Sequence, residues 1–336
     1  MKRLISLVLC AVMLLLCGCA TEMDKEDSSS DQGVSVESNH SFDGSADPET
    51  ESSEFVESDF ASDAEKEESE DLSFEEELSH DEDESTEYFL NGFSYTVKEG
   101  KATVTAYHGK EANLTVPTDF DGFGVVAVSE GAFKNNAYVE TVKVSDGVIS
   151  VGENAFSGCS KLKKLSIGKD VAFIGEGVVD DCTLLESIEV SGLNTAFATK
   201  GGVLYNKEMT KLLRCPQAFE KTEFTVPESV TEIEPFAFYY CTSLKKLNLH
   251  EQITKLGAGA FYYCRSLESV AVPSLIDSVD DFLCFGCLSL KKVSLPDGLV
   301  SIGEYAFFGC TALEGLSFPE GVSVAETSFE GSGVKK

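Results

Sequence analysis

Cysteine is the residue type in this sequence whose chemistry and spacing most need an explanation. The chain holds 11 cysteines. Six of them occupy one position of a pattern with a step of 23 residues: Cys159, Cys182, Cys241, Cys264, Cys287 and Cys310. Stacked turns would bring such cysteines within the roughly 4.4–6.8 Å Cα separation of a disulfide. Packing explains the recurrence more simply, because free cysteine is among the most buried residue types. We therefore expect buried thiols.

A second cysteine pattern imitates a redox motif. Cys284 and Cys287 have the Cys-x-x-Cys spacing of thiol–disulfide oxidoreductases. Cys287 stands at the repeating cysteine position, whereas Cys284 replaces the Phe that other copies carry three residues before it. The repeat therefore accounts for this spacing without redox activity.

Histidines and paired acids offer little for catalysis. His108 and His250 are the histidines after residue 87, and neither has a Ser or Cys partner in a catalytic pattern. The acid pairs at 180–181 and 280–281 fall in predicted turns, where a solvated face explains them. Four cysteines at zinc spacing and clustered histidines are missing from the sequence. We expect no enzyme, no metal site and no cofactor.

The N-terminus has the features of an export signal. Lys2 and Arg3 precede an apolar run from Leu4 to Leu16, which is too short to span a bilayer. The run ends in the sequence LCGC, whose last residue is Cys19. This resembles the bacterial lipoprotein signal, with Leu at −3, a small residue at −1 and Cys at +1. The resemblance implies that residues 1–18 are removed and that Cys19 is acylated, which anchors the protein to the bacterial cell membrane. The alternative is an ordinary signal peptide in which Cys19 has no role.

An acidic segment follows. Residues 20–87 contain 27 Asp and Glu against two Lys, a charge of −25. Such a stretch cannot bury enough apolar surface to fold. We therefore expect residues 19–87 to be a disordered tether. The alternative is a calcium-binding acidic tail, but no spacing here matches a calcium-binding loop. The chain total of −32 leaves −9 for residues 88–336 after Lys2 and Arg3 are counted. That part lacks the basic face that nucleic acids require.

The periodic residues belong to a unit that must position them. It begins V-x-x-I-G, continues x-x-A-F-x-G-C and ends L-x-x-L-x-I-P, as in Leu162–Ile167 for the last part. A fixed period of this length predicts a solenoid, in which short parallel strands about 4.8 Å apart bury the apolar positions of successive turns. We expect a β-rich solenoid with short helical or turn segments. Residues 88–128 read as an N-terminal β-hairpin cap, which a solenoid needs to cover its first turn.

The unit I-G-x-x-A-F-x-G-C-x-x-L resembles the BspA-like, or Treponema pallidum-type, leucine-rich repeat. The resemblance spans roughly residues 90–330, with the repeats themselves at 129–336. It implies a bacterial surface protein, with members of the family linked to adhesion to host proteins, and it carries over no catalytic residue. Between Cys182 and Cys241 the step is 59 residues instead of 23, which predicts a hairpin insert near 192–223, with 202–205 paired to 211–215.

Charge alternates at the position after the first apolar residue of each predicted L-x-x-L strand. Copies carry Glu and Lys in turn, with Thr222 in the variant copy between Glu186 and Lys245: Glu140, Lys163, Glu186, Lys245, Glu268, Lys291 and Glu314. Neighbouring parallel strands would set opposite charges side by side. We interpret this stripe as a device that sets the register on the exposed face of the sheet.

Aromatic residues form a second line in the last four copies. Tyr239, Tyr262, Phe285 and Phe308 follow the Ala-Phe position, and Tyr240 and Tyr263 replace the usual Gly. These rings either pack beneath the turns or form an exposed strip, and exposed apolar strips mark interaction sites. They are the candidate contact surface. The sequence therefore predicts a lipid-anchored surface protein that binds extracellular or host macromolecules, proteins above all. The alternatives are an envelope scaffold without a host ligand and a carbohydrate-binding module.

Overall fold

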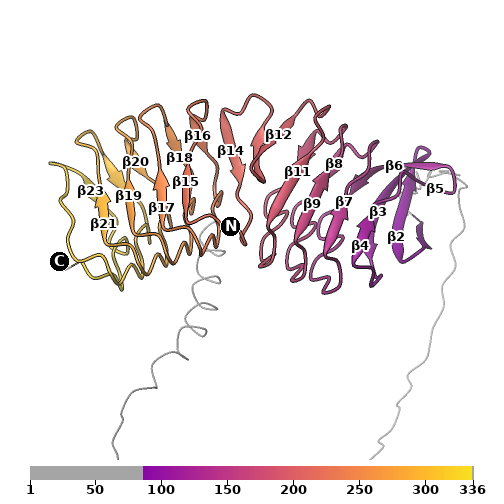
Figure 1. Ribbon diagram of the computed structural model, residues 1–336, viewed down its shortest axis with the longest axis horizontal. Helices are drawn as coiled ribbons and strands as arrows, with labels where there is room; N and C mark the ends of the chain where they lie inside the picture. The colour runs from indigo at the N-terminus through magenta and orange to yellow at the C-terminus, as the bar shows by residue number, and fades with distance from the viewer. Residues whose placement is uncertain (1–85, 335–336) are drawn as a thin grey trace, which may run out of the picture. The chain divides into compact units, whose positions relative to one another are not determined.

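The computed structural model describes residues 86–334, which form a series of stacked strand-bearing turns (Figure 1). The predicted signal peptide, Cys19 and nearly all of the predicted tether lie outside these residues. The segments between strands in the described part are turns and bends, and no helix occurs there. None of its elements is therefore a helix long and apolar enough to cross a membrane. The predicted β-rich solenoid is confirmed, with turns alone in place of the short helical segments.

The first strands form an antiparallel unit. The hairpin of β2 and β3 turns through Glu99 and Gly100, both in the left-handed region, with φ of 52° and 72°. β1 pairs with the other edge of β2, and β3 pairs in parallel with β6, which begins the solenoid. The strands of this region are β1 (Glu87–Leu90), β2 (Phe93–Lys98), β3 (Lys101–Tyr107), β5 (Asp119–Phe120) and β6 (Phe123–Val128).

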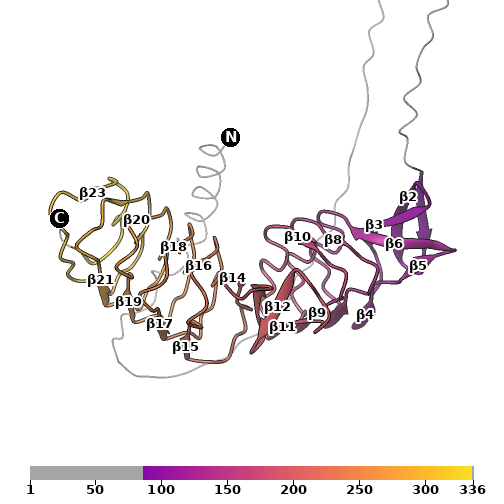
Figure 2. The same ribbon diagram turned by 90° about the horizontal axis from the view of Figure 1, so that it is seen from above.

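Most turns of the solenoid then contribute two strands that belong to two separate rows, which lie along opposite sides in Figure 2, and the last turns contribute a first-row strand alone. The first row comes from the V-x-x-I-G part of the unit: β8 (Ser150–Val151), β10 (Phe173–Ile174), β16 (Glu232–Ile233), β18 (Lys255–Leu256), β20 (Ser278–Val279), β22 (Ser301–Ile302) and β23 (Ser323–Val324). The second row comes from L-x-x-L-x-I: β4 (Asn113–Thr115), β7 (Thr141–Lys143), β9 (Lys164–Ile167), β11 (Ser187–Val190), β15 (Glu223–Thr225), β17 (Lys246–Asn248), β19 (Ser269–Ala271) and β21 (Lys292–Ser294). Within each row the pairing is parallel, as the repeat predicts.

The insert interrupts both rows. It consists of β12 (Phe197–Lys200), β13 (Val203–Asn206) and β14 (Lys211–Arg214). β13 pairs antiparallel with β14, and β12, which the sequence did not predict, pairs with the other edge of β13. β14 then pairs in parallel with β16 and so begins the first row again. The apolar interior divides at the same place into two clusters, one drawn from residues 93–204 and the other from residues 203–329.

Phenylalanine of the Ala-Phe position fills the interior of most turns, and Val179 and Cys284 take its place in two of them. Phe156, Phe238, Phe261 and Phe307 are fully buried. Successive rings touch, with centroids 4.9 Å apart for Phe133 and Phe156 and 5.8 Å apart for Phe238 and Phe261. The repeat thus supplies one continuous apolar column per cluster, which single turns cannot bury alone.

The repeating cysteines satisfy carbonyl groups of neighbouring turns. The Sγ atom of Cys264 lies 3.2 Å from the carbonyl oxygen of Phe238 in the preceding turn, and Cys159 lies at the same distance from that of Phe133. Cys182, Cys287 and Cys310 repeat the contact. All eight cysteines of the described residues are free and buried, so the expectation of buried thiols is confirmed. Cysteine recurs because a small apolar side chain with a weak S–H donor fits this position.

Asp280 stands where the first row is interrupted. The sheet that contains β18 ends with that strand, and a new sheet begins at β20. Most complete copies have Gly at this position, and a Cβ on Gly257 would lie 2.4 Å from the backbone nitrogen of Pro235 in the preceding turn. Glu234 also carries a side chain at this position, yet β16 pairs with both β14 and β18. A side chain there is therefore not sufficient by itself to interrupt the row.

Candidate interaction surface

The candidate contact residues form a stack of rings across the last four complete turns. Tyr239, Tyr262, Phe285 and Phe308 follow one another with centroid distances of 5.6, 4.9 and 4.7 Å and interplanar angles of 17°, 12° and 12°. The stack arises because one position of the unit is aromatic in four successive turns. Tyr262 and Phe285 are each 4% exposed, whereas Tyr239 and Phe308 are half-buried. The two inner rings therefore support the surface from below and do not themselves offer contact area.

Tyr240 and Tyr263 border this stack on one side, and both are half-buried. They stand at the Gly position of the unit with φ of 57° and 54°, the left-handed conformation that Gly158 adopts there with φ of 71°. Their rings stack on each other at 4.8 Å and 21°. The next turn has Gly286 at this position, where a Cβ would lie 2.8 Å from the Tyr263 ring. Glycine in one turn therefore makes room for the tyrosine of the turn before it.

A second border consists of aromatic residues that the sequence analysis missed. Phe236, Phe282 and Tyr305 come directly before the Ala-Phe pair or its substitute and are half-buried. They too have positive φ, of 56°, 61° and 56°, and Phe282 stacks on Tyr305 at 5.5 Å and 8°. Other copies have small or amide residues here, Gly131, Asn154, Gly177 and Gly259. Gly and Asn at one repeat position indicate a left-handed backbone conformation. Aromatic residues at that same position were therefore the sequence signal that could have identified this border.

We name the nine residues together the aromatic strip: Phe236, Tyr239, Tyr240, Tyr262, Tyr263, Phe282, Phe285, Tyr305 and Phe308. Five of them are aromatic residues in the left-handed region, which costs an L-residue roughly 1–2 kcal/mol. Ring pairs contribute about 0.5–1.5 kcal/mol each beyond their buried area. Stacking therefore offsets part of the backbone cost. Backbone strain that persists in this way clusters at functional sites.

Charged groups surround the aromatic strip. The Tyr239 hydroxyl donates to Asp181 Oδ1 at 3.2 Å, and burial together with this carboxylate raises the pKa of Tyr239. Asp281 and Glu304, both exposed, come directly before Phe282 and Tyr305. Glu330, also exposed, takes the place in the next turn that Phe308 has in its own. Arg265 lies over the rings of Tyr263 and Tyr240, with its guanidinium carbon 5.0 and 6.0 Å from their centroids.

A buried ion pair attaches the insert to the start of the strip. Arg214 at the end of β14 lies 2.7 Å from Asp180 Oδ1 and donates from Nη1 to the Phe236 carbonyl oxygen at 2.7 Å. Burial raises the pKa of Asp180, and the nearby Arg214 guanidinium opposes this shift. The expectation that the pair at 180–181 is solvated holds for Asp181, which is exposed, and is wrong for Asp180.

The remaining candidates for chemistry have structural partners. His108 Nε2 lies 3.2 Å from Ser94 Oγ, and His250 contacts the carbonyl of Pro227 and the side chain of Gln252. Burial raises the pKa of Cys284 and of Cys287, so neither is a reactive thiolate. Across residues 86–334 no three His, Cys, Asp or Glu side chains are placed to hold a metal ion.

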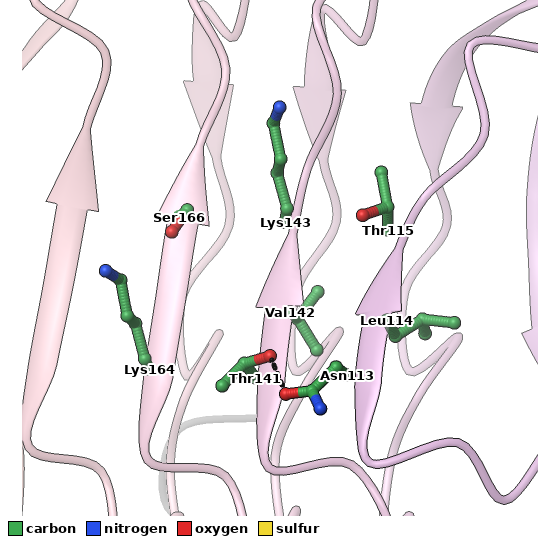
Figure 3. A pocket seen from close by; sticks show the side chains of 8 residues that line it. All are labelled: Asn113, Leu114, Thr115, Thr141, Val142, Lys143, Lys164 and Ser166. Atoms are coloured by element: carbon green, nitrogen blue, oxygen red, sulfur yellow. Dashed lines mark hydrogen bonds between the residues drawn. The ribbon is translucent and has the colours of Figure 1, made fainter.

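The exposed face of the second row carries the charge stripe. Lys163 and Glu140 lie 2.8 Å apart on neighbouring turns, and Lys291 and Glu268 lie 3.6 Å apart, as the alternation predicts. A shallow hollow of about 280 Å³ lies between β4, β7 and β9 on this row (Figure 3). Lys143 and Lys164 extend beside it, and Thr141 Oγ1 donates to Asn113 Oδ1 at 2.8 Å. Lys164 pairs with Glu189 at 2.7 Å, so part of this positive charge is already neutralised.

The fold and the repeat define a leucine-rich-repeat solenoid. The family model described as the BspA type leucine rich repeat region matches residues 122–211 and 215–335 with six copies. This is more than half of the chain, and the chain belongs to that family. The resemblance inferred from the I-G-x-x-A-F-x-G-C unit is confirmed.

Solved structures show a similar architecture. A leucine-rich repeat protein from Bacteroides ovatus is 25% identical with a TM-score of 0.51, over 70% of this chain and 60% of that one. A leucine rich cell surface protein from Faecalibacterium prausnitzii is 21% identical with a TM-score of 0.47, over 74% and 93%. The Treponema pallidum leucine rich repeat protein is 24% identical with a TM-score of 0.40, over 68% and 91%. A comparison with curated proteins gives no match.

Proposed function

We propose that this solenoid is an interaction module that binds a protein partner through the aromatic strip. The observation that carries the proposal is the placement of five aromatic residues at left-handed positions that glycine, asparagine or aspartate occupies in earlier turns. Glycine adopts the left-handed conformation at the lowest energetic cost. The presence of aromatic residues at these positions therefore points to a role other than stabilising the backbone. Tyrosine is enriched among the residues that dominate binding energy at protein interfaces.

We propose further that the module is displayed on the bacterial cell surface. The LCGC sequence ending at Cys19 supports lipid anchoring, and the acidic residues 19–87 supply a spacer between anchor and solenoid. The name of the similar F. prausnitzii structure, a cell surface protein, supports the same location. A displayed interaction module of this kind would serve adhesion to host or matrix proteins.

Binding to a panel of extracellular-matrix proteins tests the proposal. The test protein is residues 19–336 with Cys19→Ser, which prevents acylation. We expect saturable binding to a panel member, weakened by the double substitution Tyr240→Gly and Tyr263→Gly. Asn135→Gly, at the same left-handed position of an earlier turn (φ 61°), is the matched control and leaves binding unchanged. Binding that survives the tyrosine substitutions excludes the strip. No binding by folded protein favours a scaffold role in the envelope.

Lipidation has its own test. Metabolic labelling with a fatty-acid analogue is expected to mark the chain and to be abolished by Cys19→Ala. Cys17→Ala, two residues away at a tolerated position of the signal, retains the label. A Cys19→Ala chain that is still labelled contradicts the anchor.

A further inference from the structure

The charges around the aromatic strip indicate what kind of partner it accepts. Carboxylates lie at both ends and along one border: Asp181 beside Tyr239, Asp281 and Glu304 beside Phe282 and Tyr305, and Glu330 after Phe308. Positive charge is sparse there. Of the six cations among residues 236–310, four lie in or directly before β17 and β21 in the second row, and Lys255 lies near Asp280. Arg265 is the sixth, and it stacks on Tyr263 and Tyr240.

Arg265 shows how the strip handles a cation. Its guanidinium lies over the Tyr263 ring at 5.0 Å although no carboxylate pairs with it among the ion pairs of the described residues. A guanidinium is weakly hydrated and planar, which favours stacking on an aromatic ring. The chain therefore already contains one arginine packed against the aromatic strip.

The stacking of the rings decides how further cations would bind. The half-buried rings of the two borders stack in pairs, Tyr240 on Tyr263 at 4.8 Å and Phe282 on Tyr305 at 5.5 Å, so each ring covers one face of its partner and its exposed part includes the ring edge. Ring edges carry partial positive charge and do not attract cations. They do offer apolar surface to the aliphatic stems of Arg and Lys, whose charged ends then reach outward. Bordering carboxylates that could pair with those ends belong to exposed residues next to the rings in the chain, Asp281 and Glu304, and to Glu330 in the following turn.

We propose, building on the proposed function, that the aromatic strip binds an extended segment rich in arginine and lysine. Stems lie across the ring edges, and guanidinium or ammonium groups pair with Asp181, Asp281, Glu304 and Glu330. Arginine is favoured over lysine, because its planar group forms two hydrogen bonds with one carboxylate.

The test measures the affinity of labelled peptides of about 12 residues for residues 19–336 with Cys19→Ser. One peptide alternates Arg and Ser, one Lys and Ser, and one Glu and Ser. We expect the affinity order Arg above Lys above Glu, with affinity falling as salt rises. The triple substitution Asp281→Asn, Glu304→Gln and Glu330→Gln removes charge and keeps the rings. Tyr240→Gly with Tyr263→Gly removes two rings and keeps the charges. Each is expected to weaken the Arg peptide by at least about fivefold.

The matched control changes the same positions in earlier turns. Glu130→Gln and Glu153→Gln correspond to Asp281 and Glu304, and Asn135→Gly corresponds to Tyr240. This variant is expected to bind the Arg peptide like the parent. Equal binding by every variant would assign the peptide to the acidic residues 20–87 and overturn the proposal. A different outcome is that a matrix protein binds only when Tyr240 and Tyr263 are present while the Arg peptide does not bind. This outcome would overturn the proposal of a cationic partner but would still support the proposed interaction module.

Discussion

The turns before the insert and the turns after it share the same interior and strand rows but present different residues at their surfaces. Both contain buried phenylalanines, S–H contacts to a neighbouring carbonyl and parallel strand rows. At the two left-handed positions, however, the earlier turns carry only Gly, Asn or Asp, whereas the later turns carry five aromatic residues, Phe236, Tyr240, Tyr263, Phe282 and Tyr305, beside Gly259, Gly286 and Gly309. The interior is therefore constrained by stacking, and the outer turn positions vary with little effect on the frame.

This comparison predicts that damage to the interior is equally severe in both parts. Phe156→Ala before the insert and Phe261→Ala after it each remove a fully buried ring that contacts the ring of an adjacent turn. Each is expected to lower the free energy of unfolding by about 3–5 kcal/mol. Chemical denaturation followed by circular dichroism measures the change. A large loss for one substitution and a small loss for the other would show that the two parts do not share one kind of interior.

Loss of the Arg214–Asp180 ion pair, which links the insert to the turn before it, is expected to have the next largest effect on stability. Arg214→Met removes the partner of Asp180 and leaves a largely buried carboxylate unpaired. Because Asp180 keeps some exposure, we expect a loss of roughly 2 kcal/mol at neutral pH, below the full cost of breaking a buried pair. Arg265→Met, on the exposed side of the strip, is the control.

The pH dependence of this loss has a definite sign. The pKa of Asp180 is already raised in the folded state, and the loss of Arg214 removes the interaction that opposes this shift. A raised carboxyl pKa favours folding below the unfolded-state pKa, and this contribution is lost as pH rises through the folded-state pKa. The deficit of Arg214→Met therefore shrinks as the solution is acidified. A deficit independent of pH would mean that packing of the arginine stem, and not charge, is lost.

Exchange of residues between the two parts at the left-handed position is expected to change the free energy of unfolding less than the substitutions above, and by different amounts in the two directions. Tyr263→Gly installs the residue that Gly158 and Gly286 supply at the same φ. Relief of the left-handed cost offsets the lost ring contacts, so we expect a change in unfolding free energy below about 1 kcal/mol. Gly158→Tyr is expected to cost more, about 1–2 kcal/mol, because its Cβ would lie 2.1 Å from Asn135 Oδ1 and no aromatic neighbour compensates. Thermal unfolding measures both, and equal costs would contradict the idea that the later turns are adapted to the rings.

The same contrast explains how far the sequence alone leads. The 23-residue step predicted the solenoid, the parallel rows and the buried thiols, because stacking forces each position to repeat its environment. It also identified the central line from Tyr239 to Phe308. Burial of Tyr262 and Phe285 did not follow, because it depends on ring neighbours from both borders. One border was missed, since Phe236, Phe282 and Tyr305 share no residue type with Gly131 or Asn154, only a backbone conformation.

The charge stripe provides the smallest predicted effect and a further comparison between the parts. Lys163 pairs with Glu140 before the insert at 2.8 Å, and Lys291 pairs with Glu268 after it at 3.6 Å, with all four side chains substantially exposed. Exposed pairs contribute little, so Lys163→Ala and Lys291→Ala are each expected to change stability only slightly, and less at high salt. Reversal tests register more directly. Lys163→Glu places three acidic side chains on adjacent turns, at positions 140, 163 and 186, and side-by-side like charges are destabilising. The double variant Glu140→Lys with Lys163→Glu again sets opposite charges side by side at positions 140 and 163. If the double variant is no more stable than Lys163→Glu alone, alternation does not contribute to register, and the stripe is only the solvated face of the second row.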